Sequence, residues 1–208
     1  MGKPPDSTVK SGNERFTANG KPLNLSLLGF WQWAYSELLN NTQRGILAEY
    51  LVKEALGVDY DYWVNWTDYD LTSTDGLKAE VKSASYLQSW QQKRLSTIRF
   101  DIAKKSSWSE ENGRGSSKNR SSDIYIFCLL KEKDRDKVNP LNLDQWEFLV
   151  IRTKDLDENC GEQQTIGLNR LLRLNPTIAR YDQLHATVSE IAKDFGQLSV
   201  PPSPNPWI

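Results

Sequence analysis

Cysteine and histidine are scarce in this 208-residue chain, which holds two cysteines and one histidine. Two cysteines exclude a disulfide framework and a four-cysteine zinc site. The single histidine, His185, excludes a cluster of histidine ligands and leaves little room for a histidine-based triad. Cys128 lies in the apolar run IYIFCLL, so we expect it to be a small buried hydrophobic residue. The low cysteine content favours a reducing compartment, and we expect a cytoplasmic protein.

Long apolar runs and an excess of one charge are also absent. No segment approaches the roughly 20 apolar residues of a membrane helix, and the polar N-terminus lacks the apolar stretch of a signal peptide, so no membrane partner is expected. The formal net charge is −1, whereas a protein that coats nucleic acid non-specifically is usually basic. Local patches or bound cations would therefore have to hold a nucleic-acid partner.

The chain divides into three parts by composition. Residues 1–22 form a polar arm that we expect to be flexible, 23–196 form one domain, and 197–208 form a proline-rich tail that cannot be helical. Helical spacing of apolar residues predicts helices over 26–41, from Asn41 or Thr42 as cap to Gly57, and from Asn175-Pro176 onwards.

Strands are expected between these helices. Extended segments are predicted around Tyr62, up to Leu71, over Leu77–Ala84, and in TIRFDIA, DIYIFCLL and QWEFLVIRT. Lys104–Ser122 has no periodicity and is rich in Ser, Gly and Asn, so it reads as a long exposed loop. Helices alternating with strands in this order predict an α/β or α+β fold with a mixed sheet.

The segment YDLTSTDGLKAEVKSA brings acidic residues together across a turn. If Thr74-Asp75-Gly76 is a three-residue hairpin loop with left-handed Gly76, Asp70 lies opposite Glu80, and Lys82 follows on the same face. A two-residue Asp75-Gly76 loop would send the two acids to opposite faces. Hydrophobic alternation favours the longer loop, because it places Leu71 on the face of Ala79.

Two opposed carboxylates repel each other unless a cation lies between them. Oxygen ligands from two acids suit Mg²⁺, which keeps several waters and accepts phosphate oxygens. The ammonium of Lys82 would orient an attacking water or stabilise charge on the phosphate. Asp70, Glu80 and Lys82 thus supply the parts for phosphodiester hydrolysis. The alternative is a solvated strand face with ordinary charge pairing, and Asp75 is expected to be a turn residue.

Asp70, the hairpin and Glu80-Val81-Lys82 resemble the motif of the PD-(D/E)XK, or restriction-endonuclease-like, nuclease superfamily. The resemblance covers roughly Thr42 to Thr153 and implies an α/β fold with a restriction-endonuclease-like core, a mixed central β-sheet flanked by helices. It departs from the pattern in the missing proline before Asp70 and in an unclear helix after Lys82. Metal binding by Asp70, Glu80 and the Val81 carbonyl is what the resemblance implies, with Mg²⁺ or alternatively Mn²⁺ as cofactor.

Further site residues follow from the resemblance and from charge. Glu49 occupies the place of a helix glutamate that members often add; its alternative is an ordinary salt bridge with Lys53. Gln88 resembles a polar residue that some members place after the lysine. The remaining candidates are basic residues of the predicted loop, which either grip phosphates or are simply solvated: Lys104, Lys105, Arg114, Lys118 and Arg120.

The leading hypothesis is a Mg²⁺-dependent hydrolase, a DNA endonuclease of the restriction, repair or defence type. Many relatives act as dimers on the two strands of a duplex, so a homodimer is expected by analogy. The alternative is a catalytically silent nuclease fold that serves as a nucleic-acid-binding or protein-interaction module. Exposed aromatic residues such as Trp31, Trp33 and Trp90 would suit that second role.

Overall fold

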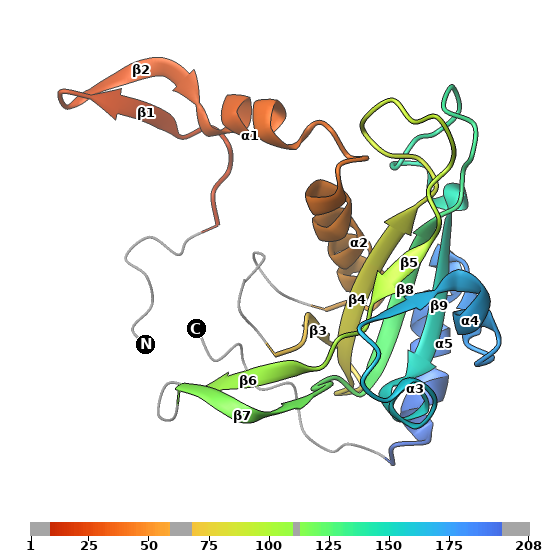
Figure 1. The fold of residues 1–208 in the computed structure, drawn as a ribbon. Coiled ribbons are helices and arrows are strands. Elements are labelled where there is room, and N and C mark those ends of the chain that lie inside the picture. Colours follow the sequence, from red (N-terminus) through yellow and green to blue (C-terminus); the bar gives the residue numbers. More distant parts are fainter. Residues whose placement is uncertain (1–8, 59–67, 110–112, 197–208) are drawn as a thin grey trace.

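The computed structural model describes residues 9–58, 68–109 and 113–196 (Figure 1). Its centre is a five-stranded sheet in the order β11–β9–β8–β4–β3. The strands are β3 (Leu71–Thr72), β4 (Lys78–Ser85), β8 (Ile124–Leu130), β9 (Trp146–Arg152) and β11 (Thr177–Ala179). β4 and β8 run parallel and the other neighbours run antiparallel, so the predicted mixed sheet is confirmed.

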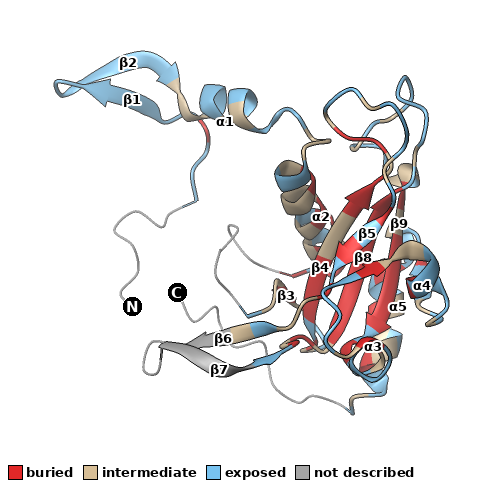
Figure 2. Ribbon diagram, viewed as in Figure 1, coloured by how far each residue is buried: buried red, intermediate tan, exposed pale blue. Residues whose placement is uncertain are grey.

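Helices cover both faces of this sheet. One face packs against α2 (Asn41–Ala55) and α5 (Leu184–Lys193), the other against α3 (Thr153–Cys160), α4 (Leu168–Leu172) and a small sheet of β5 (Arg99–Asp101) and β10 (Thr165–Gly167). All seven residues of β8 are buried, as its apolar composition predicts, and the central strands form the buried interior in Figure 2. Alternate side chains of β4 and β8 enter the two cores.

The hairpin between β3 and β4 has the register that apolar alternation favours. Leu71 lies opposite Ala79 and Thr72 opposite Lys78, and Gly76 has a φ of 84°. The three-residue loop is therefore confirmed and the two-residue alternative is wrong. Gly76 is required there because a side chain in this left-handed conformation costs about 1–2 kcal/mol.

The helix before this hairpin begins slightly earlier than predicted. The side chain of Asn40 accepts a hydrogen bond from the Thr42 N–H, so Asn40 is the cap, rather than Asn41 or Thr42. Gly57 ends the segment with a φ of 62°, which confirms its predicted left-handed role. The predicted strand around Tyr62 lies outside the described residues.

The described part of the predicted flexible arm is ordered structure. β1 (Arg15–Ala18) and β2 (Lys21–Ser26) form a hairpin followed by α1 (Leu27–Tyr35), and this module projects from the body in Figure 1. Asn19 and Gly20 both have positive φ, the conformation that favours Asn-Gly in tight hairpins. That dipeptide was the signal for a strand pair that spans the expected boundary at residue 22.

Two other segments differ from the sequence expectation. The predicted loop at 104–122 contains a hairpin of β6 (Lys105–Ser109) and β7 (Gly113–Asn119), although its polar composition carries no strand signal. The predicted final helix begins only at Leu184, because Asn175 takes a left-handed φ of 52° and Thr177–Ala179 pairs with β9. Sheet pairing overrides the local helix signal there.

No helix in the described ranges is long and apolar enough to cross a membrane. The proline-rich tail at 197–208 lies outside the described residues.

Candidate active site

Two acids and a lysine converge beside the first residue of the short strand β3. Lys82 Nζ lies 2.6 Å from Glu80 Oε1 and 3.7 Å from Asp70 Oδ2. Glu80 and Lys82 stand two residues apart on β4, so their side chains share one face, and Asp70 reaches them from the partner strand. The structure therefore brings together the three residues that the hairpin register predicts.

Backbone contacts fix the position of Asp70. Its N–H donates to the Ala79 carbonyl at 3.1 Å, and its Oδ2 accepts the Val81 N–H at 2.7 Å. The N–H and C=O of one strand residue lie at the same edge, so the Val81 carbonyl also lies on the side of Asp70. Lys82 Nζ donates to that carbonyl at 3.1 Å.

Glu80 is buried, with 3% of its side chain exposed. Its Oε1 contacts a second ammonium, because Lys105 Nζ also lies at 2.6 Å. The sequence predicts Lys105 in a loop that either grips phosphates or is solvated, whereas the β6–β7 hairpin brings it to the acid cluster. No local sequence signal joins residues 80 and 105, since only the tertiary fold makes them neighbours.

Burial and charge set the protonation of this cluster. Burial raises the pKa of Asp70, and the nearby Glu80 carboxylate raises it further, against the opposing effect of Lys82. Burial alone would lower the pKa of Lys82, but the carboxylates of Asp70 and Glu80 outweigh it and raise that pKa. Lys82 is therefore a cation at neutral pH.

Glu49 lies half-buried on α2, the helix that packs beside β4. Burial raises the pKa of the Cys128 thiol, and the charges of Glu49 and Asp70 raise it further while Lys82 lowers it. The charges of Glu49, Asp70 and Lys82 therefore all act on the Cys128 thiol.

Gln88 lies beyond the end of β4 and is buried. Its Nε2 donates to the Ser85 carbonyl at 3.0 Å and to Ser96 Oγ at 3.2 Å. None of its hydrogen bonds in the described part reaches Asp70, Glu80 or Lys82, so the structure does not join Gln88 to the cluster.

The segment that carries this cluster is similar to a known protein family. The sequence model of the bacteriophage T4 endonuclease IV family matches residues 32–170, about two thirds of the chain. The chain belongs to this endonuclease family. The match includes Asp70, Glu80 and Lys82, and it excludes the β1–β2 hairpin and α5. No curated protein matches the chain.

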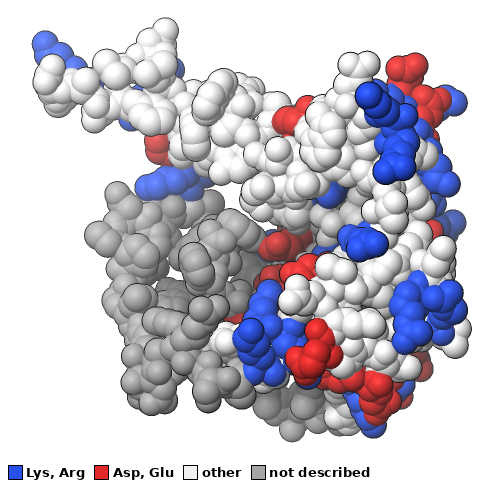
Figure 3. Space-filling view, in the orientation of Figure 1, with Lys and Arg blue, Asp and Glu red and all other residues white. Residues whose placement is uncertain are grey.

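The basic residues predicted to bind nucleic acid lie in different environments in this endonuclease-family chain. Lys104 pairs with Glu162 at 2.6 Å, and Lys118 is exposed. The side chain of Arg114 lies outside the described residues. Basic and acidic side chains are interspersed over the coloured part of the face shown in Figure 3, so no field of one sign covers the described residues there.

Arg120 corrects the expectation of a phosphate contact. Its side chain is 0% exposed and pairs with Asp157. Its guanidinium also donates to the carbonyls of Ile102 at 2.8 Å, Gly161 at 3.0 Å and Gln163 at 3.3 Å. These contacts engage four of the five N–H donors of the guanidinium, so Arg120 joins segments of the fold instead of facing solvent.

The oxygen atoms of the cluster are potential metal ligands. Within the described ranges, no group of three or more His, Cys, Asp or Glu side chains could hold a metal. Two carboxylates and the Val81 carbonyl nevertheless supply hard oxygen donors side by side. Mg²⁺ is commonly held by one or two carboxylates with waters completing its shell, so the donor chemistry suits it.

Proposed function

We propose that the protein is a Mg²⁺-dependent DNA endonuclease whose active site is the Asp70, Glu80 and Lys82 cluster. The observation that carries the proposal is the convergence of Lys82 Nζ on both carboxylates inside a chain of an endonuclease family. Asp70, Glu80 and the Val81 carbonyl would hold Mg²⁺, with Mn²⁺ as an alternative. When bound, the metal supplies Lewis-acid polarisation of a phosphate and a more acidic water.

The protein's own groups have distinct roles. Lys82 cannot act as a general base while the neighbouring carboxylates keep it protonated, so it acts as a donor. Its ammonium orients the attacking water or stabilises the negative charge that develops on the phosphate. The Val81 N–H holds Asp70 Oδ2 in place at 2.7 Å. Glu49 supports the site from α2 through its charge.

The proposed superfamily is the PD-(D/E)XK nucleases. The helix α2, the β3–β4 hairpin and the parallel β4–β8 pair support it. The order differs after Lys82, because the described residues between β4 and β8 contain β5, β6 and β7 and no helix. A hairpin thus takes the place of the helix that the resemblance implies, and it delivers Lys105 to Glu80.

The biological setting is proposed by analogy. Restriction, repair or defence would each use a DNA endonuclease, and a homodimer would let two sites act on the two strands of a duplex. Both cysteines are free and buried, which agrees with the proposed cytoplasmic location.

Nicking of supercoiled plasmid DNA tests the proposed function. The wild-type protein should convert supercoiled to nicked or linear DNA with Mg²⁺ and should stop when EDTA is added. Lys82→Ala and Asp70→Ala should each lose this activity while keeping wild-type circular dichroism. Cutting that survives both substitutions would assign the activity to another site or to a contaminant. A folded, DNA-binding wild type that never cuts would favour the silent module.

Lys105 should weaken metal binding in the absence of DNA. Its ammonium holds Glu80 Oε1, the atom that a divalent cation would contact. Lys105→Ala should therefore raise Mn²⁺ affinity about threefold to tenfold, as expected for removing one like charge near the ion. Titration calorimetry measures the change, and Lys104→Ala, whose partner is Glu162, is the control. Equal or weaker affinity in Lys105→Ala would show that the two cations do not compete.

A further inference from the structure

A cavity of about 370 Å³ lies beyond the acid cluster, where β4 ends. Its wall combines the first turn of α2, the end of β4, the loop that follows and the start of β5. The residues that matter for its chemistry are Arg44, Ser83, Ser85, Gln88, Trp90 and Arg99. Polar groups dominate this wall, and none of the three acids discussed above, Glu49, Asp70 and Glu80, belongs to it.

Arg44 brings an uncompensated positive charge to this cavity. The residue is 4% exposed, yet it forms no ion pair with any described residue. Its guanidinium donates only to the Leu39 carbonyl at 3.0 Å and to Asn41 Oδ1 at 2.8 Å, and its Nε has no partner in the described part. Buried charges are normally paired, so this arginine lacks an anion.

Other groups of the wall favour the same kind of ligand. Burial lowers the pKa of Arg44 only to about 10, so it stays charged at neutral pH. Arg99 is exposed and also has no ion pair among the described residues. The 15-residue helix α2 points its N-terminal end at the cavity through Asn41, and that end attracts anions.

The edge of β4 joins the cavity to the acid cluster. The N–H of Val81 points to the side where β3 pairs, and the backbone groups of Ser83 and Ser85 point to the same side because alternate residues of a strand share one edge. Val81 and Ser83 are roughly 7 Å apart at the usual rise of a strand. Since Ser83 lines the cavity, a polymer with one phosphate at the cluster reaches the cavity with its next unit.

The loop on the far side of the cavity is held in shape before any ligand arrives. Arg135 Nη2 donates to the carbonyls of Gln88 at 2.7 Å and Trp90 at 2.6 Å. Gln92 Oε1 accepts the Gln88 N–H at 2.7 Å, and Ser96 N–H donates to the Tyr86 carbonyl at 2.9 Å. Trp90 is 56% exposed at this rim, so its ring is available for stacking on a base.

We propose that this cavity is a subsite for the nucleotide next to the scissile phosphate, and that Arg44 and Arg99 bind the phosphate of that nucleotide. The proposal rests on the proposed function for the identity of the polymer as DNA. Arg44 is thereby a binding residue of the active site that lies on α2 and outside the acid cluster.

Binding in metal-free buffer tests the subsite without any need for cleavage. A fluorescein-labelled 20-base-pair duplex and its separated strands are titrated with protein in EDTA, and the form that binds more tightly is followed by anisotropy at several salt concentrations. Arg44→Gln and Arg99→Gln should each bind about tenfold more weakly at low salt. Each should also reduce the slope of log K against log salt by about 0.9 for a duplex or 0.7 for a single strand.

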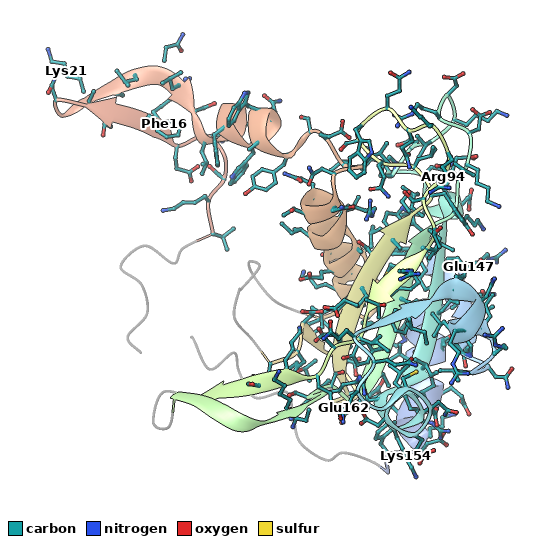
Figure 4. The ribbon with its side chains drawn as sticks, in the orientation of Figure 1. Phe16, Lys21, Arg94, Glu147, Lys154 and Glu162 are labelled. Carbon is teal, nitrogen blue, oxygen red and sulfur yellow. The ribbon has the colours of Figure 1, made fainter. Side chains whose placement is uncertain are left out.

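Two controls separate a subsite from a structural or diffuse effect. Arg94→Gln removes the same charge from an exposed position on the same loop that does not line the cavity (Figure 4), and it should keep the wild-type slope. Arg44→Lys keeps the charge and should recover part of the affinity. If Arg44→Gln does not fold, as judged by circular dichroism, Arg99→Gln decides.

The outcomes are distinguishable from those for the proposed function. Wild-type slopes in Arg44→Gln and Arg99→Gln, equal losses in all three arginine variants, or no binding of DNA by the wild type would each overturn the subsite. Reduced slopes in a protein that never cuts DNA would leave Arg44 and Arg99 as phosphate-binding residues of the cavity and remove the proposed function. Cleavage by wild type with unchanged slopes in the variants would support the proposed function and overturn the subsite.

Discussion

Glu80→Gln should slow DNA cleavage by about 10³-fold or more, because it removes one charged oxygen donor from the centre of the cluster. Glu80 Oε1 is the atom on which Lys82 and Lys105 both converge at 2.6 Å. The neutral amide keeps the shape of the side chain but neither neutralises these ammoniums nor binds Mg²⁺ strongly. Single-turnover cleavage rates at saturating Mg²⁺ measure the loss.

The fold should survive this substitution. Lys105 is 52% exposed and can turn to water, and Lys82 keeps Asp70 at 3.7 Å. Glu162→Gln is the matched control, since Glu162 (labelled in Figure 4) is 81% exposed and Lys104 is its one ion-pair partner among the described residues. Its rate should equal that of wild type. A Glu80→Gln rate within tenfold of wild type would exclude Glu80 as a metal ligand.

Arg120→Ala should lower the free energy of unfolding by about 1–3 kcal/mol, the range found when a buried polar group loses its hydrogen-bond partner. The variant leaves three carbonyl groups without their donor, at Ile102, Gly161 and Gln163. Asp157 is 44% exposed, so water can satisfy its carboxylate. Most of the cost therefore comes from the carbonyl of Ile102, which is 1% exposed. Urea unfolding followed by circular dichroism measures the difference.

Lys118→Ala provides the contrast for Arg120. Lys118 is an exposed basic residue only two positions away, and its removal should change stability by less than about 0.5 kcal/mol. The pair separates a structural arginine from a solvated lysine within one predicted basic segment. Equal stabilities of Arg120→Ala and wild type would contradict the structural role.

The β3–β4 hairpin can be predicted from the sequence because its signals are local. Gly76 marks the left-handed end of the loop, and the apolar positions Leu71, Ala79 and Val81 fix which side chains share a face. A shift of one residue would expose that apolar set, so the register and the pairing of Asp70 with Glu80 follow together. The buried strand β8 was equally predictable from its continuous apolar run.

The remaining features depend on contacts between distant segments. Lys105 reaches Glu80 through a polar hairpin without alternation, and Arg44 lines one cavity with Ser85 because α2 packs beside β4. Arg120 reads as a solvated loop residue in the sequence, while its carbonyl partners lie 18 to 43 residues away. Such partners carry no mark in the local pattern, so charge alone predicted neither the Lys105–Glu80 contact nor the burial of Arg120, and it did not single out Arg44.

Calorimetric titration of the EDTA-treated protein with Mn²⁺ tests the central claim most directly. If Asp70, Glu80 and the Val81 carbonyl hold a divalent cation, wild type should bind Mn²⁺, and Asp70→Asn and Glu80→Gln should each abolish that uptake while remaining folded. Glu162→Gln should bind as wild type does. Absence of Mn²⁺ uptake by wild type, or unchanged uptake in both Asp70→Asn and Glu80→Gln, would contradict the account.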